Sequence, residues 1–193
     1  GRKAFDESAA LTLDVWDDRF ARAGEAWRDL RIRTLDVLGP TITTAYRDLA
    51  GRDLPVRADY RSEWAEVGLA AALRAGRDDD LRRGVTTVGP HRDEIELRID
   101  GLPARTHASQ GEQRSLALAL RLAVHRAVTD VDGTSPILLL DDVLSELDDG
   151  RGTGLLAHLP PGQTLLTTAG HLPPDTVPDR ILDVADGVVT PRD

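Results

Sequence analysis

Two acidic side chains at the end of an apolar run are the residues best suited to chemistry. Residues 137–140 are consecutive branched aliphatics, and Asp141 and Asp142 follow them directly. Such a run predicts a strand buried on both faces, as in a parallel sheet. Ligands of open α/β sheets bind at the carboxyl ends of the strands. A carboxylate there can hold a hydrated Mg²⁺ ion, and a second can orient or deprotonate a water molecule.

A second binding element precedes this run. Ser109 and Glu112 have the spacing of a capping box, which predicts that a helix begins at Gln110. Gly111 leaves the backbone open beside that start, and a helix N-terminus with a hydroxyl and free N–H groups is an anion site. Taken alone, each element also fits an ordinary capped core helix or a core strand followed by an acidic turn. Their occurrence together and in this order favours a nucleotide site.

Three motifs in this order resemble those of ATP-binding-cassette (ABC) ATPases. Residues 109–113 (Ser-Gln-Gly-Glu-Gln) resemble the signature motif, residues 137–142 the Walker B strand, and residues 145–148 (Ser-Glu-Leu-Asp) the D-loop. Their particular form, together with Gly-Pro-His-Arg-Asp at 89–93, resembles the RecF family of DNA replication and repair proteins. The resemblance extends over residues 16–189. It implies an α/β fold, the C-terminal part of an ABC-type ATPase head with a parallel-sheet core and a β-hairpin, joined to a helical segment.

One motif of that family has no counterpart in the chain. The Walker A loop is Gly-rich and ends in Gly-Lys-Ser/Thr, whereas the only lysine is Lys3, outside any such loop. Without this loop the chain has no ordinary cradle for the β- and γ-phosphates of ATP. We therefore expect a C-terminal portion of a RecF-like protein that is inactive on its own.

The resemblance implies a role for each motif in a homodimer that binds ATP between its two heads. Asp141 would help to hold Mg²⁺ through water, and Asp142 would position or deprotonate the attacking water. The signature residues would contact the γ-phosphate of ATP held by the partner subunit, and two D-loop residues would couple the sites. The signature residues are Ser109, Gln110, Gly111 and Gln113, and the D-loop residues are Ser145 and Asp148.

Two further positions are candidates by resemblance. Thr167 or Thr168, at the end of a predicted strand over 163–168, would be the switch residue. His91 and Arg92 would contact phosphate, of either nucleotide or DNA. For this pair, a structural turn in which both side chains satisfy local carbonyls and carboxylates is an equally good explanation.

The function that the resemblance implies is a slow, ATP-driven dimerising clamp on DNA. It would act at gapped DNA or single-strand/double-strand junctions in the cytoplasm, associated with the nucleoid, and would assist recombinase loading with recombination mediator proteins. An alternative is a non-catalytic module that supplies the signature face in trans, or another ABC/SMC-type ATPase head. A transporter ATPase subunit is a weaker alternative, because residues 89–93 and the preceding helical segment weigh against it.

The amino-acid composition excludes several kinds of site and surface. The chain has 193 residues, a net charge of −9 and no cysteine, which excludes disulfides and thiolate metal sites. The negative charge argues against a strong DNA-binding surface made by this chain alone. The histidines lack metal-ligand spacing. Neither a signal peptide nor a membrane-length apolar run is found, so we expect a soluble protein without a membrane partner.

The elements that must position these motifs fall into two parts. Residues 1–52 are predicted to be a helical segment, the end of the family's insertion lobe by resemblance. The helix is expected to begin near Leu11, after a loose stretch over residues 1–9. Apolar residues from Trp16 to Val37 follow coiled-coil spacing and are expected to pack between helices, with an interruption at Gly39-Pro40. Residues 53–193 are predicted to be the C-terminal half of the ATPase head.

Within the second part, local signals predict several elements. An edge strand is expected over 54–60, and a helix capped by Ser62 is expected to run to Ala75. Residues 95–99 alternate as a half-exposed strand, with a hairpin turn at Asp100-Gly101 and an antiparallel return over 102–106. A last hairpin is expected at Asp186-Gly187.

Overall fold

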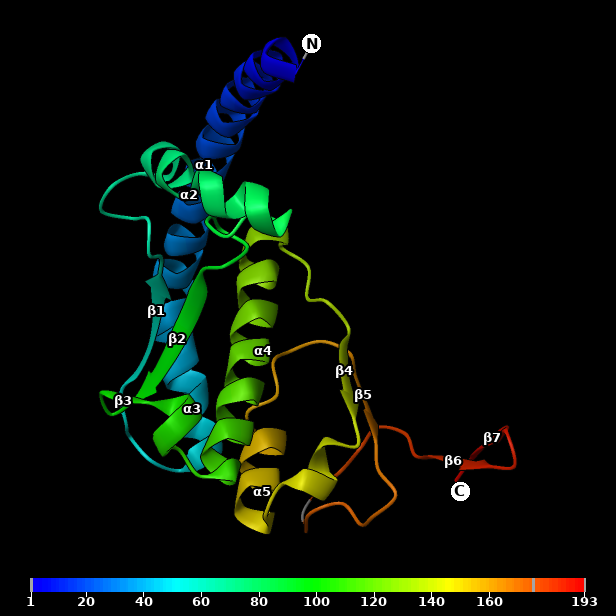
Figure 1. The fold of residues 1–193 in the computed structure, drawn as a ribbon. Helices are drawn as coiled ribbons and strands as arrows, with labels where there is room; N and C mark the ends of the chain where they lie inside the picture. The colour runs from blue at the N-terminus through cyan, green and yellow to red at the C-terminus, as the bar shows by residue number, and fades with distance from the viewer. Residues whose placement is uncertain (1, 175, 193) are drawn as a thin grey trace.

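Two helices form the centre of the molecule. The computed structural model describes residues 2–174 and 176–192, with side chains from residue 12 onward. Helix α1 (Arg2–Ala50) is 49 residues long, and its N-terminal end projects beyond the rest of the fold (Figure 1). Helix α4 (Gln110–Asp132) packs against α1. The residues that resemble the signature motif therefore begin a helix that packs against α1, the longest helix among the described residues.

A small antiparallel sheet covers α1. Strands β1 (Val56–Arg61), β2 (Glu94–Ile99) and β3 (Leu102–Pro103) pair in that order, which makes β1 an edge strand as predicted. Asp100 and Gly101 have φ values of 50° and 78°, the left-handed pair of a two-residue hairpin turn. The return strand is shorter than predicted, because the chain enters the short helix α3 (Ala104–His107) after Pro103, which has no N–H to donate.

The candidate carboxylates end a parallel pair of strands. Strand β4 (Leu138–Asp141) pairs in parallel with β5 (Thr164–Thr167), and the connection contains the 3₁₀ helix η1 (Val143–Glu146) and helix α5 (Asp149–Ala157). Strands β6 (Leu182–Ala185) and β7 (Val188–Pro191) then form the predicted hairpin through Asp186-Gly187. The predicted α/β class with a parallel sheet is thereby confirmed.

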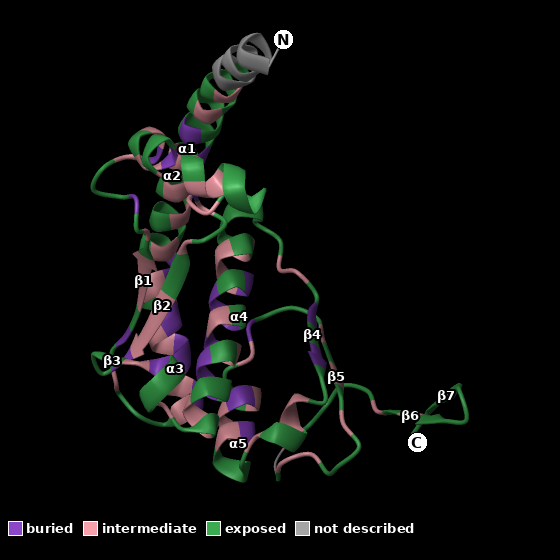
Figure 2. Ribbon diagram, in the orientation of Figure 1, coloured by how far each residue is buried: buried purple, intermediate pink, exposed green. Residues whose placement is uncertain are grey.

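The core lies between α1, α4, α5 and one face of each neighbouring sheet (Figure 2). Its fully buried side chains include Ile42 and Tyr46 of α1, Leu122 of α4 and Leu155 of α5. A smaller cluster of Ala21, Trp64, Leu69 and Leu73 fastens helix α2 (Leu69–Arg83) to the N-terminal half of α1. The His125 ring bonds the Pro136 carbonyl at 2.8 Å and joins α4 to the start of β4.

The predicted interruption at Gly39-Pro40 is wrong. Helix α1 continues through Pro40 without a break. A proline costs a helix one hydrogen bond and crowds the preceding turn. Here Leu38 before Pro40 and Ile42 after it are both buried in the same core, so packing on either side of the proline holds the helix together.

The expectation that the apolar residues from Trp16 to Val37 pack between helices is also wrong. Trp16 is 60% exposed and Val37 is 70% exposed. The guanidinium groups of Arg19 and Arg31 lie over the rings of Trp16 and Trp27, respectively. Helix α1 instead turns small residues toward its neighbour. A Cβ on Gly24 would lie 2.4 Å from Leu69 Cδ2, so a side chain at this position would have to displace the buried Leu69 side chain of α2.

Two other expectations need correction. The helix predicted from Ser62 to Ala75 is shifted toward the C-terminus: α2 begins at Leu69, because Gly68 at φ 82° cannot be part of a helix. The helix ends at Arg83 and is capped by Gly84 in the left-handed conformation. The apolar run 137–140 is not buried on both faces: Leu138 and Leu140 pack on the core, whereas Ile137 is 57% and Leu139 is 68% exposed. Within the described residues, α4 and α5 cover one face of β4, the face that carries Leu138 and Leu140 (Figure 2).

Candidate functional site

The two adjacent carboxylates are held at the edge of the parallel sheet by a threonine of the neighbouring strand. Thr167 lies opposite Asp141 in the register, and its hydroxyl donates to Asp141 Oδ1 at 2.5 Å. The Thr167 hydroxyl oxygen also accepts from the backbone N–H of Asp142 at 3.0 Å. Among the described residues, the hydroxyl of Thr168, the other switch candidate, accepts only from the Gly170 N–H. Of the two, Thr167 is therefore the residue in contact with the Asp141 carboxylate and with the backbone of Asp142.

Asp142 has an unusual backbone conformation. Its φ of 49° and ψ of 25° are left-handed, and it precedes η1. Aspartate tolerates this region better than most residues, although it still carries strain. The Ser145 hydroxyl donates to the Asp142 carbonyl at 2.8 Å and supports the turn. The first residue of the D-loop thereby shapes the backbone beneath the second carboxylate.

The donor chemistry at this edge fits a hydrated magnesium ion. Both carboxylates are exposed and supply hard oxygen ligands, the type that Mg²⁺ prefers. No cluster of three or more histidine, aspartate or glutamate side chains is placed to hold a metal in the described part of the chain. The ligand set here is thus open, as in sites where water and substrate phosphates complete the coordination of Mg²⁺.

The signature turn is a complete capping box. The Ser109 N–H and hydroxyl both donate to Glu112 Oε2 at 2.8 Å, and the Glu112 N–H donates back to Ser109 Oγ at 3.3 Å. Among the described residues, the N–H groups of Gln110 and Gly111 have no hydrogen-bond partner. These two donors stand at the positive end of a 23-residue helix, the arrangement that binds anions.

The Glu112 carboxylate stays ionised beside these donors. The hydrogen bonds from the Ser109 N–H and then its hydroxyl hold the pKa of Glu112 below its ordinary value, with nearby Arg52 and Arg151 adding to the effect. Arg52, just beyond α1, pairs with Glu112 Oε1 at 3.2 Å. Gln113 turns its amide inward instead, donating to the carbonyls of Ala104 and Ala108. In this structure Gln113 therefore fastens α3 to α4.

The D-loop is fastened to the signature helix. Asp148 caps α5 by accepting from the Arg151 N–H at 2.9 Å, and the Arg151 guanidinium pairs with the same carboxylate. Arg114 of α4 reaches across to Glu146, donating to its carbonyl at 2.9 Å and pairing with its carboxylate at 3.3 Å. The two motifs thus occupy one end of the molecule, where α4 begins beside α5 (Figure 1).

The turn at 89–93 is organised by its last residue. The Asp93 carboxylate accepts from the Tyr60 hydroxyl at 2.7 Å and from Trp64 Nε1 at 2.9 Å. Arg31 of α1 donates to the Pro90 carbonyl at 2.8 Å. Trp64 is almost fully buried, so Asp93 is the acceptor that satisfies its indole N–H. Asp93 therefore has a structural role in fixing the turn.

The two candidate contact residues of that turn have different surroundings. The His91 ring bonds the Thr86 carbonyl at 3.0 Å, which matches the structural explanation. The Arg92 side chain is exposed and makes no hydrogen bond or ion pair within the described chain. This turn leads into β2 near α2, at the opposite end of α4 from the signature turn (Figure 1). The structure therefore does not bring His91 or Arg92 to the signature residues of the same chain.

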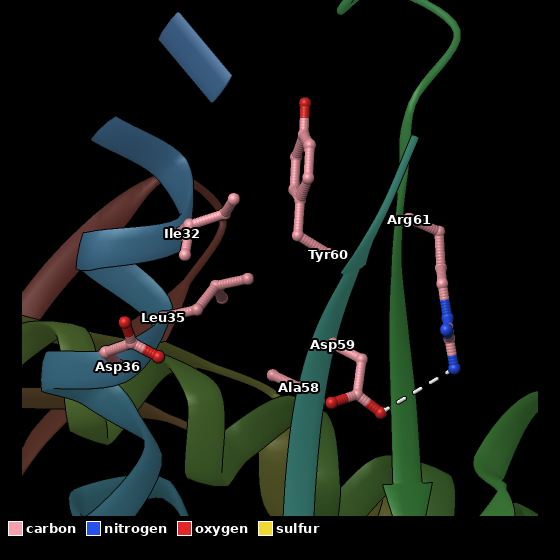
Figure 3. A pocket seen from close by; sticks show the side chains of 7 residues that line it. All are labelled: Ile32, Leu35, Asp36, Ala58, Asp59, Tyr60 and Arg61. Carbon is pink, nitrogen blue, oxygen red and sulfur yellow. Dashed lines mark ion pairs between the residues drawn. The ribbon is translucent and has the colours of Figure 1, made fainter. Parts of the chain in front are cut away.

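An open groove of about 350 Å³ lies between α1 and β1 (Figure 3). Its lining is mixed, with Ile32 and Leu35 from the helix and Tyr60 from the strand, and Asp59 pairs with Arg61 at its rim. None of the predicted site residues lines this groove.

Sequence reasoning missed the arginines that connect the motifs. Arg151, Arg114 and Arg52 contact Asp148, Glu146 and Glu112, respectively. A local signal existed only for Arg151, which lies three residues after the Asp148 cap on a helix. The other two partners are distant in sequence, and only the fold brings them together.

The arrangement of elements defines the class of the protein: it has the fold of the C-terminal part of an ABC-type ATPase head. A solved structure of an SMC head bound to the C-winged helix domain of ScpA shares this fold, with a TM-score of 0.54 over 93% of this chain at 17% identity. No family model matches the sequence.

Within this class the chain matches RecF. It is 41% identical over 176 residues to the DNA replication and repair protein RecF of Acidothermus cellulolyticus, and 39% identical over 183 residues to that of Frankia alni. A solved structure of the recombination mediator protein RecF with ATP has a TM-score of 0.77 at 28% identity. These matches confirm the resemblance and fit a C-terminal portion of RecF.

The matches cover most of this chain but only about half of each relative. The matches cover 85% and 87% of this chain but 47% and 48% of the two RecF sequences, and 94% of this chain but 50% of the RecF–ATP structure. The chain thus spans about half the length of the relatives it matches. Across its described residues, no helix combines the length and hydrophobicity needed for a membrane span.

Proposed function

We propose that this chain supplies the signature motif, Walker B carboxylates and D-loop of a RecF-type ATPase in DNA repair. The observation that carries the proposal is the carboxylate pair at the end of a parallel strand, with Thr167 bonded to Asp141. The capped helix start at Ser109, with free N–H groups beside it, supports the same reading. In this scheme residues 1–52 end the helical insertion lobe and residues 53–193 belong to the ATPase head.

In the proposed cycle, ATP lies between two heads of a homodimer. Asp141 takes part in holding Mg²⁺ through water, and Asp142 orients or deprotonates the attacking water. Ser109 and the N–H groups of Gln110 and Gly111 face the γ-phosphate held by the partner subunit, with Gln113 behind them. The binding energy of ATP closes the dimer and hydrolysis reopens it. Ser145 and Asp148 transmit the state of one site to the other.

The DNA part of the proposal concerns the complete protein. Closure of the dimer would clamp gapped DNA or single-strand/double-strand junctions, and recombination mediators would use this state to assist recombinase loading. Arg92 is the proposed phosphate contact, because its charge is exposed and unpaired in the described chain. A net charge of −9 implies that residues outside this chain, or the dimer, provide most of the positive surface.

Calorimetry with ATP and Mg²⁺ tests the proposal. We expect no binding by this chain alone, and binding with slow hydrolysis once it is combined with the Walker A-containing N-terminal half of a RecF relative. Binding without hydrolysis by the combined halves would favour the non-catalytic module. Tight binding by this chain alone would show that the phosphate cradle lies elsewhere, with residues 84–93 as the next region to test.

A further inference from the structure

Arg151 contacts two motifs with one planar group. Its guanidinium lies against Gly111 of the signature turn: a Cβ on that glycine would be 2.6 Å from Nη1 and 3.0 Å from Cζ. The same Nη1 pairs with the Asp148 carboxylate of the D-loop. The space that a side chain at position 111 would need is therefore occupied by Arg151.

The Arg151 side chain is held firmly in this place. Its backbone N–H donates to Asp148 Oδ1 at 2.9 Å, so the residue is attached to the D-loop at two points. The side chain is only 25% exposed, and its Nε is buried without a hydrogen-bond partner. Leaving a buried N–H unpaired has a cost. The contacts with Gly111 and Asp148 are the ones that place the guanidinium group.

The positive charge of Arg151 lies beside the N-terminus of α4, where the helix dipole disfavours a cation. A cation beside a helix N-terminus opposes the helix dipole, so this position does not stabilise α4 as an isolated helix. It does raise the positive potential at a turn that already carries free N–H groups, which favours an incoming anion. The partnership with Asp148 keeps the arginine there.

We propose that Arg151 is a positioning residue that holds the signature turn in register with the D-loop, so that both motifs meet the partner subunit's nucleotide as one unit. This inference rests on the proposed function. It also gives a reason for glycine at position 111 within this chain, since any larger residue displaces the guanidinium. Arg114, which bonds Glu146, is a second tie between the same segments and limits how far they separate when Arg151 is changed.

The first test uses this chain combined with the Walker A-containing half. Arg151→Ala should weaken ATP-dependent dimerisation by about tenfold, the effect of one charge-assisted contact, while ATP affinity measured under non-dimerising conditions changes by less than about twofold. Arg151→Lys keeps a charge for Asp148 but lacks the planar group over Gly111, so it should restore dimerisation only in part. Arg82→Ala, on the distant helix α2, is the matched control and should match the unmodified protein.

The second test asks whether Gly111 and Arg151 act through each other. Gly111→Ala should fold, because the far end of a flexible arginine can move aside, but it should separate Arg151 from the turn. The double variant should then dimerise no worse than Gly111→Ala alone. Additive losses in the double variant, or dimerisation of Arg151→Ala within twofold of the control, would overturn the proposal.

A third readout does not depend on ATP. Hydrogen exchange at the amides of residues 109–113 should become faster in Arg151→Ala and stay unchanged in Arg82→Ala. If the unmodified protein fails to dimerise with ATP, the proposed function falls, and hydrogen exchange alone decides on Arg151. Unchanged exchange in Arg151→Ala would then refute its positioning role.

Discussion

Thr167 connects the two strands of the parallel sheet at the point where the candidate chemistry lies. Its hydroxyl donates to Asp141 Oδ1 at 2.5 Å and accepts from the Asp142 N–H at 3.0 Å. This oxygen thereby orients one carboxylate and helps to fix the backbone of the next residue, whose N–H also donates to the Thr167 carbonyl at 3.1 Å. A shift of β5 would therefore move the Asp141 carboxylate and the backbone of Asp142.

Replacing this hydroxyl should slow hydrolysis. Thr167→Val keeps the β-branched shape that suits a strand but removes the bridge between Asp141 and Asp142. We expect steady-state phosphate release by the combined halves to fall by about tenfold, the equivalent of one hydrogen bond. Thr168→Val is the control, because the Thr168 hydroxyl contacts only the Gly170 N–H. Equal losses in both variants would remove Thr167 from its proposed role.

Asp142→Asn should trap the ATP-bound dimer. Asparagine tolerates the left-handed backbone at this position, so the substitution removes the charge with little added strain. Loss of a general base should lower the hydrolysis rate by about 100-fold or more, while light scattering shows a persistent dimer with ATP. Asp149→Asn, in the first turn of α5, provides the control. Normal turnover in Asp142→Asn would exclude a catalytic role for Asp142.

Ser109→Arg should separate nucleotide binding from dimerisation. A bulky cation at the helix cap blocks the face offered to the partner subunit, whereas ATP held by the other motifs should bind with nearly unchanged affinity. Ser109→Asn keeps a good cap and controls for helix stability, since loss of a cap costs about 1 kcal/mol. Calorimetry and light scattering are the measurements. Equal loss of ATP affinity and dimerisation in Ser109→Arg would make Ser109 a structural residue.

The capping box should make stability depend on acid pH. The pKa of Glu112 is lowered from its ordinary 4.5, chiefly by the Ser109 N–H and hydroxyl. A lowered folded-state pKa contributes stability above the unfolded-state value, and that contribution is lost as the pH falls through the folded-state value. Glu112→Gln can keep the box but cannot titrate. Urea unfolding between about pH 5 and pH 3 should therefore show a steeper loss in the unmodified chain than in Glu112→Gln. Parallel slopes would contradict this account.

The turn at 89–93 allows structure and DNA binding to be tested separately. Asp93→Ala leaves the Tyr60 hydroxyl and the buried Trp64 N–H without their acceptor, so it should destabilise the fold by about 2–4 kcal/mol in urea unfolding. Arg92→Ala should leave stability within about 0.5 kcal/mol. In the combined halves, Arg92→Ala should weaken DNA binding and reduce its salt dependence by about one ion. An unchanged salt dependence would mean that Arg92 does not contact phosphate.

Local chemistry in the sequence was enough to predict several elements. The Ser109–Glu112 spacing set the start of α4, and Asp100-Gly101 and Asp186-Gly187 set two hairpin turns. The apolar run before Asp141 located a parallel strand with the carboxylates at its carboxyl end. These signals depend on interactions between residues a few positions apart, so they do not depend on how the rest of the chain packs.

Tertiary packing decided the rest. The core around Leu38 and Ile42 carries α1 through Pro40, against the local preference of a proline to end a helix. Which face of β4 is covered depends on where α4 and α5 lie, and apolar residues on both faces cannot reveal that. The contact of Arg151 with Gly111, like that of Asp93 with Tyr60 and Trp64, joins residues that lie 29 to 40 positions apart in the chain. Such contacts are selected by packing of the whole fold, because no local interaction specifies them.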